Sequence, residues 1–388
     1  MDKNNGAIYD ARKLGKPKMI ILGIQHMFAM FGATILVPIL TGLDISTTLL
    51  MAGLGTLLFH CITKFKVPAF LGSSFAFLGG YAAIKAFSPN DPNSMLPYAC
   101  LGVACAGLIY FILAAVIKAV GIEKVMRFFP PVVTGPIIIA IGLGLAPSAV
   151  SNCTTNWFLA VVALAVIVVF NIWGKGMAKI IPIILGLLIS YGTGLVLYFI
   201  SQANPDLIQN VPWLFSGGAD ANGVYQPIFD FTSLNTICDN ISKGHIFGSE
   251  GLIGIPIHWD KTVFGGIDYS NGALIASSII AIVPIAFATM MEHIGDICAI
   301  SSTTGNNYIK DPGLHRTLVG DGLATTLASL FGGPANTTYG ENTGVLALTR
   351  VYDPRVIRIA AYFAVAVSFF PIVSVIIGSI PSCIIGGI

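Results

Sequence analysis

The sequence predicts an all-α membrane protein that crosses the bilayer many times. Its 388 residues are 55% hydrophobic and only 10% charged, whereas soluble domains carry about 25% charged side chains. Apolar runs recur at lengths close to the ~20 residues that a spanning helix needs, and basic residues gather in alternate loops between them. These observations exclude an ordinary soluble enzyme.

The apolar runs fall into two groups separated by a long polar stretch. Seven runs fill the first group, at about residues 19–40, 46–63, 67–84, 96–120, 130–149, 157–173 and 179–200. Five follow in the second group, at about residues 272–291, 294–305, 317–333, 336–348 and 356–380. Several runs of the second group are too short to span a membrane alone.

Lysine and arginine predict the orientation of the chain. Basic residues precede the first run and follow the second, fourth and sixth runs, whereas the intervening loops of the first group contain none. Because basic loops stay in the cytoplasm, residues 1–18 are predicted to be a cytoplasmic tail. The basic loops carry Lys64 and Lys66, then Lys118, Lys124 and Arg127, and then Lys175 and Lys179.

The net charge and the cysteines indicate no further function. The net charge of +2 is dispersed, so no nucleic-acid partner is expected, because phosphate binding needs clustered basic residues. The seven cysteines form no CxxC pair and are interpreted as packing residues.

The acidic insert at 201–271 is predicted to lie outside the cell. Its run GVYQPIFDF indicates short strands or an ordered cap, and a poorly ordered loop is the equal alternative.

Two short segments suggest an inverted repeat. PAFLGSSF from Pro68 and PANTTYG from Pro334 each hold a proline, two hydroxyl residues and an aromatic residue. Matching breaks of this kind are typical of transporters built from two oppositely oriented halves. Each would be an extended strand that leads into a half-helix, whose free N–H groups can hold a ligand. A helix merely kinked by proline is the alternative.

Three acidic residues lie inside apolar runs. Glu292 and Asp296 are four residues apart, so both carboxylates lie on one face of a helix. Two carboxylates so near to each other in a low dielectric resist joint ionisation, which predicts a proton-coupling pair. The alternatives are that they pair with Lys310 or Arg316, or that Asp296 caps the next segment.

Glu341 directly follows the second break and is expected at the first turn of its half-helix, where the dipole favours a negative charge. A ligand role is favoured over a simple helix cap.

His26 in the first run is expected to contact the residues that bind the ligand and not the ligand itself. A metal site of Glu292, His293 and Asp296 has poor geometry, because His293 points about 100° away around the helix; no metal or other cofactor is predicted.

Half-helix ends, carboxylates and the aromatic residues Phe75 and Tyr339 describe a pocket for a flat ring with donors and acceptors. Several sequence motifs resemble those of a known family. ENTGVLALTR from Glu341, together with QHMFAMFGATILVP, GSSFAF, EHIGD and KDPGLHR, resembles the nucleobase-ascorbate transporter family over nearly the whole chain. Within that family the sequence looks most similar to the bacterial uracil permeases.

The resemblance implies seven plus seven segments, divided into a core domain and a gate domain. It implies that Glu292 and Glu341 contact the bound nucleobase, and that Phe75, Tyr339 and Gly340 contribute packing or backbone contacts to it. Ala33 lies nearby, His26 gives support, and Glu292, Asp296 and His26 form the proton-coupling set. Uracil permeases usually have histidine at the position of Asp296, and an acidic residue there is more similar to purine carriers. Glu341 points the other way, because xanthine and urate carriers commonly have glutamine at its position.

The expected organisation has a core and a gate that are each built from two segments. The core comprises 19–128 and 272–355, and the gate 129–200 and 356–388. Phe129–Ile137 resembles Ile380–Ile388, so a carboxy-terminal part is expected to be missing.

The expected function is uptake of a nucleobase, with uracil preferred, by proton-coupled alternating access in the bacterial inner membrane. The chain is expected not to be an enzyme, and a homodimer is possible. A xanthine or urate permease and a truncated chain that binds without transporting are the alternatives.

Overall fold

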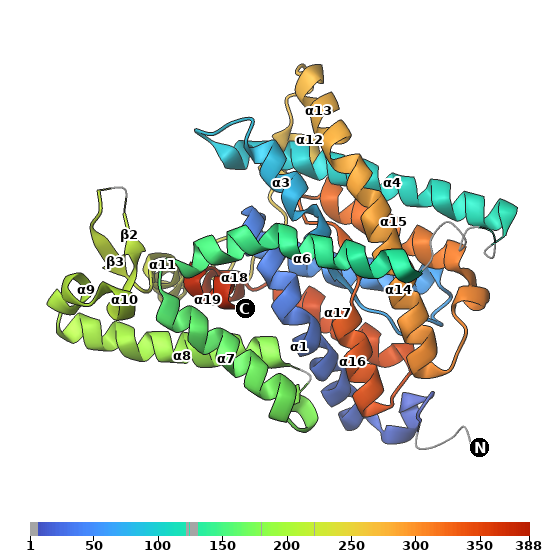
Figure 1. The fold of residues 1–388 in the computed structure, drawn as a ribbon, viewed down its shortest axis with the longest axis horizontal. Coiled ribbons are helices and arrows are strands. Elements are labelled where there is room, and N and C mark those ends of the chain that lie inside the picture. Colours follow the sequence, from blue (N-terminus) through green and yellow to red (C-terminus); the bar gives the residue numbers. More distant parts are fainter. Residues whose placement is uncertain (1–6, 122–123, 125–130, 180, 221) are drawn as a thin grey trace. The chain divides into compact units, whose positions relative to one another are not determined.

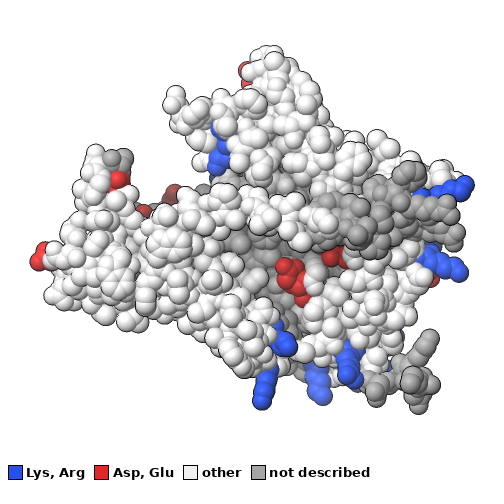
Figure 2. All heavy atoms as spheres, in the orientation of Figure 1, with Lys and Arg blue, Asp and Glu red and all other residues white. Residues whose placement is uncertain are grey.

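The computed structural model describes residues 7–121, 124, 131–179, 181–220 and 222–388, and most of their elements are helices (Figure 1). By their internal contacts they divide into two units. Unit 1 comprises Met1–Ile141 and Ile255–Phe370, and unit 2 comprises Gly142–Gly254 and Pro371–Ile388. Within the described residues, five helical segments are long and apolar enough to cross a membrane. The visible face in Figure 2 consists mostly of uncharged residues, as expected for a surface in contact with lipid.

Unit 1 is built from long helices and two short strands. In chain order they are α1 (Lys16–Thr41), α2 (Ile45–Ile62), β1 (Leu71–Ser73), η2 (Phe75–Phe77), α3 (Leu78–Lys85), α4 (Leu96–Val120), α12 (Val263–Gly266), α13 (Gly272–Ile282), η6 (Val283–Ile285), α14 (Ala286–Thr304), α15 (Leu314–Leu330), β4 (Asn336–Thr338), α16 (Gly340–Thr349) and α17 (Pro354–Ser368). Short helices also lie at Ala11–Leu14, Pro92–Met95, Trp259–Lys261 and Ile309–Gly313. Both sequence breaks lie in this unit.

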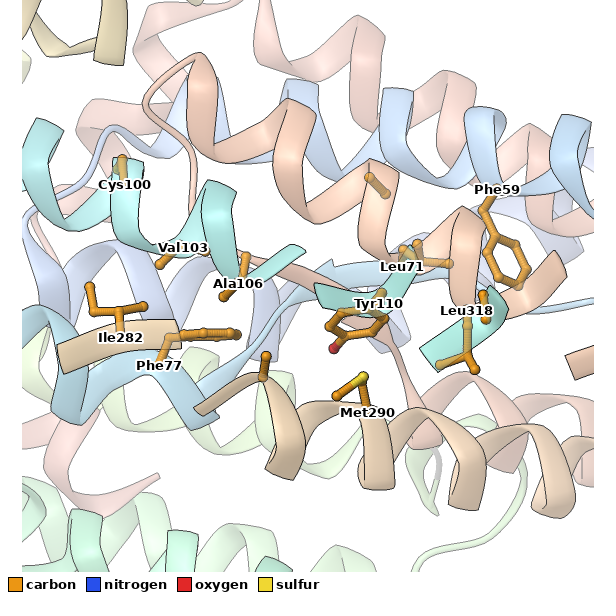
Figure 3. Packing of buried hydrophobic residues seen from close by; sticks show 14 of the residues in the cluster. Phe59, Leu71, Phe77, Cys100, Val103, Ala106, Tyr110, Ile282, Met290 and Leu318 are labelled. Carbon is orange, nitrogen blue, oxygen red and sulfur yellow. The ribbon is translucent and has the colours of Figure 1, made fainter. Parts of the chain in front are cut away.

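Small residues let α4 and α15 pack closely. A Cβ atom on Gly107 would lie 2.7 Å from the carbonyl oxygen of Gly322, and one on Gly322 would lie 2.6 Å from that of Gly107. Such close approach is how helices associate in a membrane, where hydrophobicity alone gives no drive. Beside this contact, Tyr110 lies among Leu71, Met290 and Leu318 in the core (Figure 3). The core therefore fixes α14 against α4.

The helix α17 belongs to unit 1, where it packs against α1 and α2; Figure 1 shows α1, α16 and α17 side by side. Gly23 and Gly53 face α17, because a Cβ on them would lie 2.4 Å from Ile359 Cγ2 and 2.6 Å from Val365 Cγ2. The contact boundary at residue 370 thus differs from the predicted boundary at residue 356. Whether the units act as core and gate stays a prediction.

Unit 2 holds the remaining elements. They are α7 (Trp157–Trp173), Gly176–Lys179, α8 (Pro182–Ala203), α9 (Asp206–Asn210), α10 (Pro212–Phe215), β2 (Ser216–Ala219), β3 (Tyr225–Pro227), α11 (Thr232–Ser242), α18 (Pro371–Gly378) and α19 (Ser382–Gly387). The helix α6 (Pro131–Cys153) contains the boundary between the units. β2 and β3 pair in antiparallel fashion, so the strand interpretation of GVYQPIFDF is confirmed.

The apolar runs at 272–291 and 294–305 form one helical segment, Gly272–Thr304. The helix α14 continues through Glu292 and His293, as the prediction that Glu292 and Asp296 share one helix face requires. Residues 1–6 of the predicted tail, Arg127 and the predicted boundary between 128 and 129 lie outside the described residues.

Candidate functional site

The two predicted breaks meet as a short antiparallel ribbon in unit 1. β1 pairs with β4 so that Gly72 lies opposite Thr337. The ladder extends at both ends, where Ser74 N donates to Ala335 O (2.8 Å) and Tyr339 N donates to Phe70 O (3.0 Å). Because the strands are antiparallel, the segments η2 and α16 that follow them leave the ribbon in opposite directions. The predicted strand and half-helix pair is confirmed.

Neighbouring side chains satisfy the extended backbone. Leu71 N donates to Thr56 Oγ1 (2.9 Å), which itself lies 3.2 Å from Leu71 O. Asn336 Nδ2 donates to Met51 O (2.8 Å), and Thr325 Oγ1 donates to Asn336 O. Extended backbone at membrane depth requires such partners because lipid offers none. A proline-kinked helix would not make these bonds, so that alternative is wrong.

A cavity of about 350 Å³ lies beside the ribbon, at the small end of the range for small-molecule sites. Its lining combines both breaks with one face of α14. The lining residues are Ser73, Ser74, Phe75, Glu292, Asp296, Thr337, Thr338, Tyr339, Gly340 and Glu341. Three carboxylates therefore share a cavity with the first turns of two half-helices, whose first N–H groups have no intrahelical acceptor.

Six of the eight predicted site residues line this cavity: Glu292, Asp296, Glu341, Phe75, Tyr339 and Gly340. Ala33 lies behind it, in an apolar cluster that includes Tyr339. His26 is fully buried on α1, where Asn342 Nδ2 donates to its backbone oxygen (3.1 Å) and lies 3.2 Å from Nδ1. The individual roles of these residues in binding and coupling stay predictions.

Tyr339 locks the two breaks together. The residue is 5% exposed, and its hydroxyl donates to Ser73 O (2.9 Å) while accepting from Thr34 Oγ1 (3.3 Å). A Cβ atom on Gly72 would lie 2.5 Å from the Tyr339 ring, so only glycine fits there. Because the hydroxyl is engaged inside the protein, Tyr339 offers the cavity its backbone and ring.

The alternative of cation pairing for the α14 acids is not supported. Asp296 Oδ2 accepts from Thr338 Oγ1 (2.8 Å), and Arg316 Nη1 instead donates to Ile62 O (3.5 Å). Asp296 also lies within α14, eight residues before its end at Thr304, so it caps no following segment. Among the residues that the structure describes, no group of three or more His, Cys, Asp or Glu is arranged to hold a metal ion.

Sequence reasoning missed Asp321 on α15. Its side chain is fully buried, its Oδ2 lies 3.3 Å from His293 Nδ1, and Thr337 Oγ1 donates to the same oxygen (3.4 Å). An acid within the predicted apolar run at 317–333 was the available signal, because charges inside a membrane are usually functional. No pattern in the sequence indicated a partner for His293 either.

A multi-pass helical protein with paired half-helix breaks around a polar cavity belongs to the class of membrane transport proteins. The chain is a member of the Permease family, whose model matches residues 17–388. It is therefore a transporter rather than an enzyme.

Two relatives agree with this assignment, and one solved structure resembles the chain in fold. The chain is 38% identical over 380 residues to a uracil permease of Bacillus caldolyticus, covering 95% of this chain and 75% of the relative. It is 37% identical over 387 residues to a probable uracil permease of Haemophilus influenzae, covering 97% and 79%. The transmembrane domain of a cyanobacterial bicarbonate transporter, BicA, matches with a TM-score of 0.55 at 14% identity, covering 97% and 88%.

The last likeness shows the fold alone, which is the inverted-repeat fold of core and gate. The predicted fold class is thereby confirmed. The expected loss of a carboxy-terminal part has no support from these findings.

Proposed function

We propose that this permease carries uracil together with a proton across the bacterial inner membrane by alternating access. The observation that carries the proposal is the cavity that is lined by Glu292, Asp296 and Glu341 together with the first turns of two half-helices. Uracil is a flat ring with two N–H donors and two carbonyl acceptors. Its N–H groups would donate to Glu292 and Glu341, and its carbonyls would accept from backbone N–H groups. The names of the relatives support the same base.

The proton is needed to drive accumulation. A neutral base feels no membrane potential, whereas each accompanying charge gains about 2.3 kcal/mol per 100 mV. Glu292 and Asp296 supply a place for that charge, because both line the cavity from one face of α14. In this proposal the amino terminus lies in the cytoplasm and unit 1 moves as the core. A homodimer would anchor the gate.

Uptake of labelled uracil by cells without their own permease tests the proposal. We expect uptake that rises at acidic external pH and that unlabelled xanthine does not inhibit. Glu292→Gln should abolish accumulation, because the amide cannot take up a proton. Undiminished gradient-driven uptake by this variant would remove Glu292 from the coupling set.

A purine carrier is the second candidate. The observation that favours it is Asp296 in the cavity, at the position where the resemblance leads us to expect histidine in a uracil permease. Inhibition of uptake by xanthine or urate, together with direct binding of the purine by the purified protein, would replace uracil as the substrate.

A further inference from the structure

A chain of polar contacts leads from the cavity into the protein interior. Asp296 Oδ2 accepts from Thr338 Oγ1 (2.8 Å), and the same hydroxyl lies 3.3 Å from His293 Nδ1. That nitrogen is also 3.3 Å from Asp321 Oδ2. Asp296 and Thr338 line the cavity, whereas His293 and Asp321 are fully buried. One end of the chain thus meets the cavity and the other is closed off from water.

The buried end is incompletely satisfied. Asp321 Oδ1 and His293 Nε2 have no hydrogen-bond partner among the described residues. Buried polar atoms are nearly always paired, so a carboxyl group and an imidazole with spare atoms are poor packing elements. Acid and histidine chains of this kind mark proton pathways in membrane transporters.

We propose that Thr338 and His293 relay the coupling proton between Asp296 in the cavity and the buried Asp321. The relay deepens the proposed function and rests on it. Asp321 then stores the proton away from water while the substrate occupies the cavity. Glu292 and Glu341 stay in the cavity with the base.

The atoms of the path allow a balanced transfer. The threonine hydroxyl carries one hydrogen, so it donates either to Asp296 or to His293 Nδ1. When Asp296 is protonated, it donates its hydrogen to Thr338 Oγ1, and the hydrogen of Thr338 passes to Nδ1. The O–H bond of Asp296 breaks, the hydroxyl of Thr338 re-forms, and an imidazolium remains beside the Asp321 carboxylate. Transfer from Nδ1 to Asp321 Oδ2 then leaves both groups neutral.

The surroundings of His293 favour this route. Along α14, Glu292 is its neighbour and Asp296 lies three residues further on; β4 presents Thr338, and α15 presents Asp321. On the side of α2 the Phe59 ring meets the imidazole edge-on, with centroids 6.2 Å apart. Asp321 therefore meets the imidazole directly from α15, and Asp296 is linked to it through the Thr338 hydroxyl, whereas α2 presents an apolar ring.

The test uses the whole purified protein in proteoliposomes with three measurements: uracil binding, uracil–uracil exchange without a gradient, and accumulation driven by an imposed pH gradient. His293→Gln keeps a polar side chain but cannot carry the proton. We expect binding and exchange to persist while accumulation falls ~10-fold or more, since positioned proton-transfer groups contribute at least that much.

His60→Gln is the matched control. His60 is the other fully buried histidine of the α2 and α14 region, and its Nε2 lies 2.9 Å from Ala69 O, away from the path. It should retain coupled accumulation. Accumulation at the wild-type level in His293→Gln, or equal loss of exchange and accumulation, would overturn the relay. Absence of uracil exchange by the wild-type protein would instead reject the proposed function.

A second pair of variants decides the question if His293→Gln does not fold. Thr338→Val removes the bridging hydroxyl, whereas Thr338→Ser keeps it. The relay requires that coupled accumulation be lost in Thr338→Val and rescued in Thr338→Ser. Equal accumulation in the two variants would contradict it.

Discussion

The two breaks have the same backbone and different chemistry. A shift of 265 residues places Gly72 on Thr337, Ser74 on Tyr339 and the start of η2 at Phe75 on the start of α16 at Gly340. It also exchanges the two ladder bonds that flank the ribbon. Under this shift Glu341 corresponds to Ala76.

The second break therefore brings the charge, and the first brings hydroxyl and apolar groups. Inverted repeats supply a symmetric frame, and the difference between the halves supplies recognition. A polar ring held between them would meet a carboxylate on one side and neutral dipoles on the other. The following substitutions test that division, from the largest expected effect to the smallest.

Glu341→Gln should have the largest effect on binding. Hydrogen bonds to a charged group contribute about 1.5–3 kcal/mol, so we expect uracil affinity to fall ~10- to 100-fold in calorimetric titration of the purified protein. Ala76→Ser, at the corresponding position of the first break, should change affinity less than about three-fold. Equal losses in both variants would show that charge is not confined to the second break.

Gly72→Ala should separate the two breaks. The added Cβ would lie 2.5 Å from the Tyr339 ring and 2.7 Å from Thr34 Oγ1, and overpacking of this kind costs about 1–3 kcal/mol. We expect a lower midpoint of thermal unfolding and weaker binding. In Gly344→Ala on α16 the new Cβ meets nothing within 4 Å, so the helix should gain about 0.5–1 kcal/mol. An unchanged midpoint in Gly72→Ala would show that the ribbon adapts.

The sequence predicted the two breaks but not their register. Matching the hydroxyl and aromatic residues of the two motifs aligns Ser73, Ser74 and Phe75 with Thr337, Thr338 and Tyr339, which is a shift of 264 residues. The structure instead requires a shift of 265, because only that shift places the bond from Ser74 N to Ala335 O on the bond from Tyr339 N to Phe70 O. A slip of one residue turns every side chain to the opposite face of a strand. Register depends on which backbone groups pair, and the similarity of side chains carries no such information.

The acids of the cavity were predictable, whereas the buried pair was not. Glu292, Asp296 and Glu341 stood out because each is a charge within an apolar run or at a break. Asp321 lies in a similar run, but its partner His293 is 28 residues away on another helix. Their contact depends on the packing of α14 against α15, which no local pattern contains.

Tyr339→Phe should weaken the link between the breaks without removing the ring. Its hydroxyl donates to Ser73 O, and loss of a hydrogen bond that leaves a buried acceptor unpaired costs about 1–3 kcal/mol. We expect lower thermal stability together with a ~5- to 10-fold loss of uracil affinity, because the first break is less firmly held.

Tyr110→Phe is its control, because that hydroxyl donates to Thr289 (2.6 Å) outside the cavity lining. It should lower stability by a similar amount and leave affinity unchanged. If both variants bind uracil as the wild type does, the tyrosine hydroxyl at the ribbon serves stability alone.

Ser74→Ala should give the smallest effect and test what the first break contributes. Ser74 Oγ is buried, has no hydrogen-bond partner among the described residues and lines the cavity. Ser329 Oγ on α15 is equally buried and unpaired but does not line it. Replacing an unpaired hydroxyl should not lower stability in either case. If the ligand is the missing partner of Ser74, Ser74→Ala lowers uracil affinity about three- to ten-fold and Ser329→Ala leaves it unchanged. Identical affinities in the two variants would mean that the first break holds the base through its backbone alone.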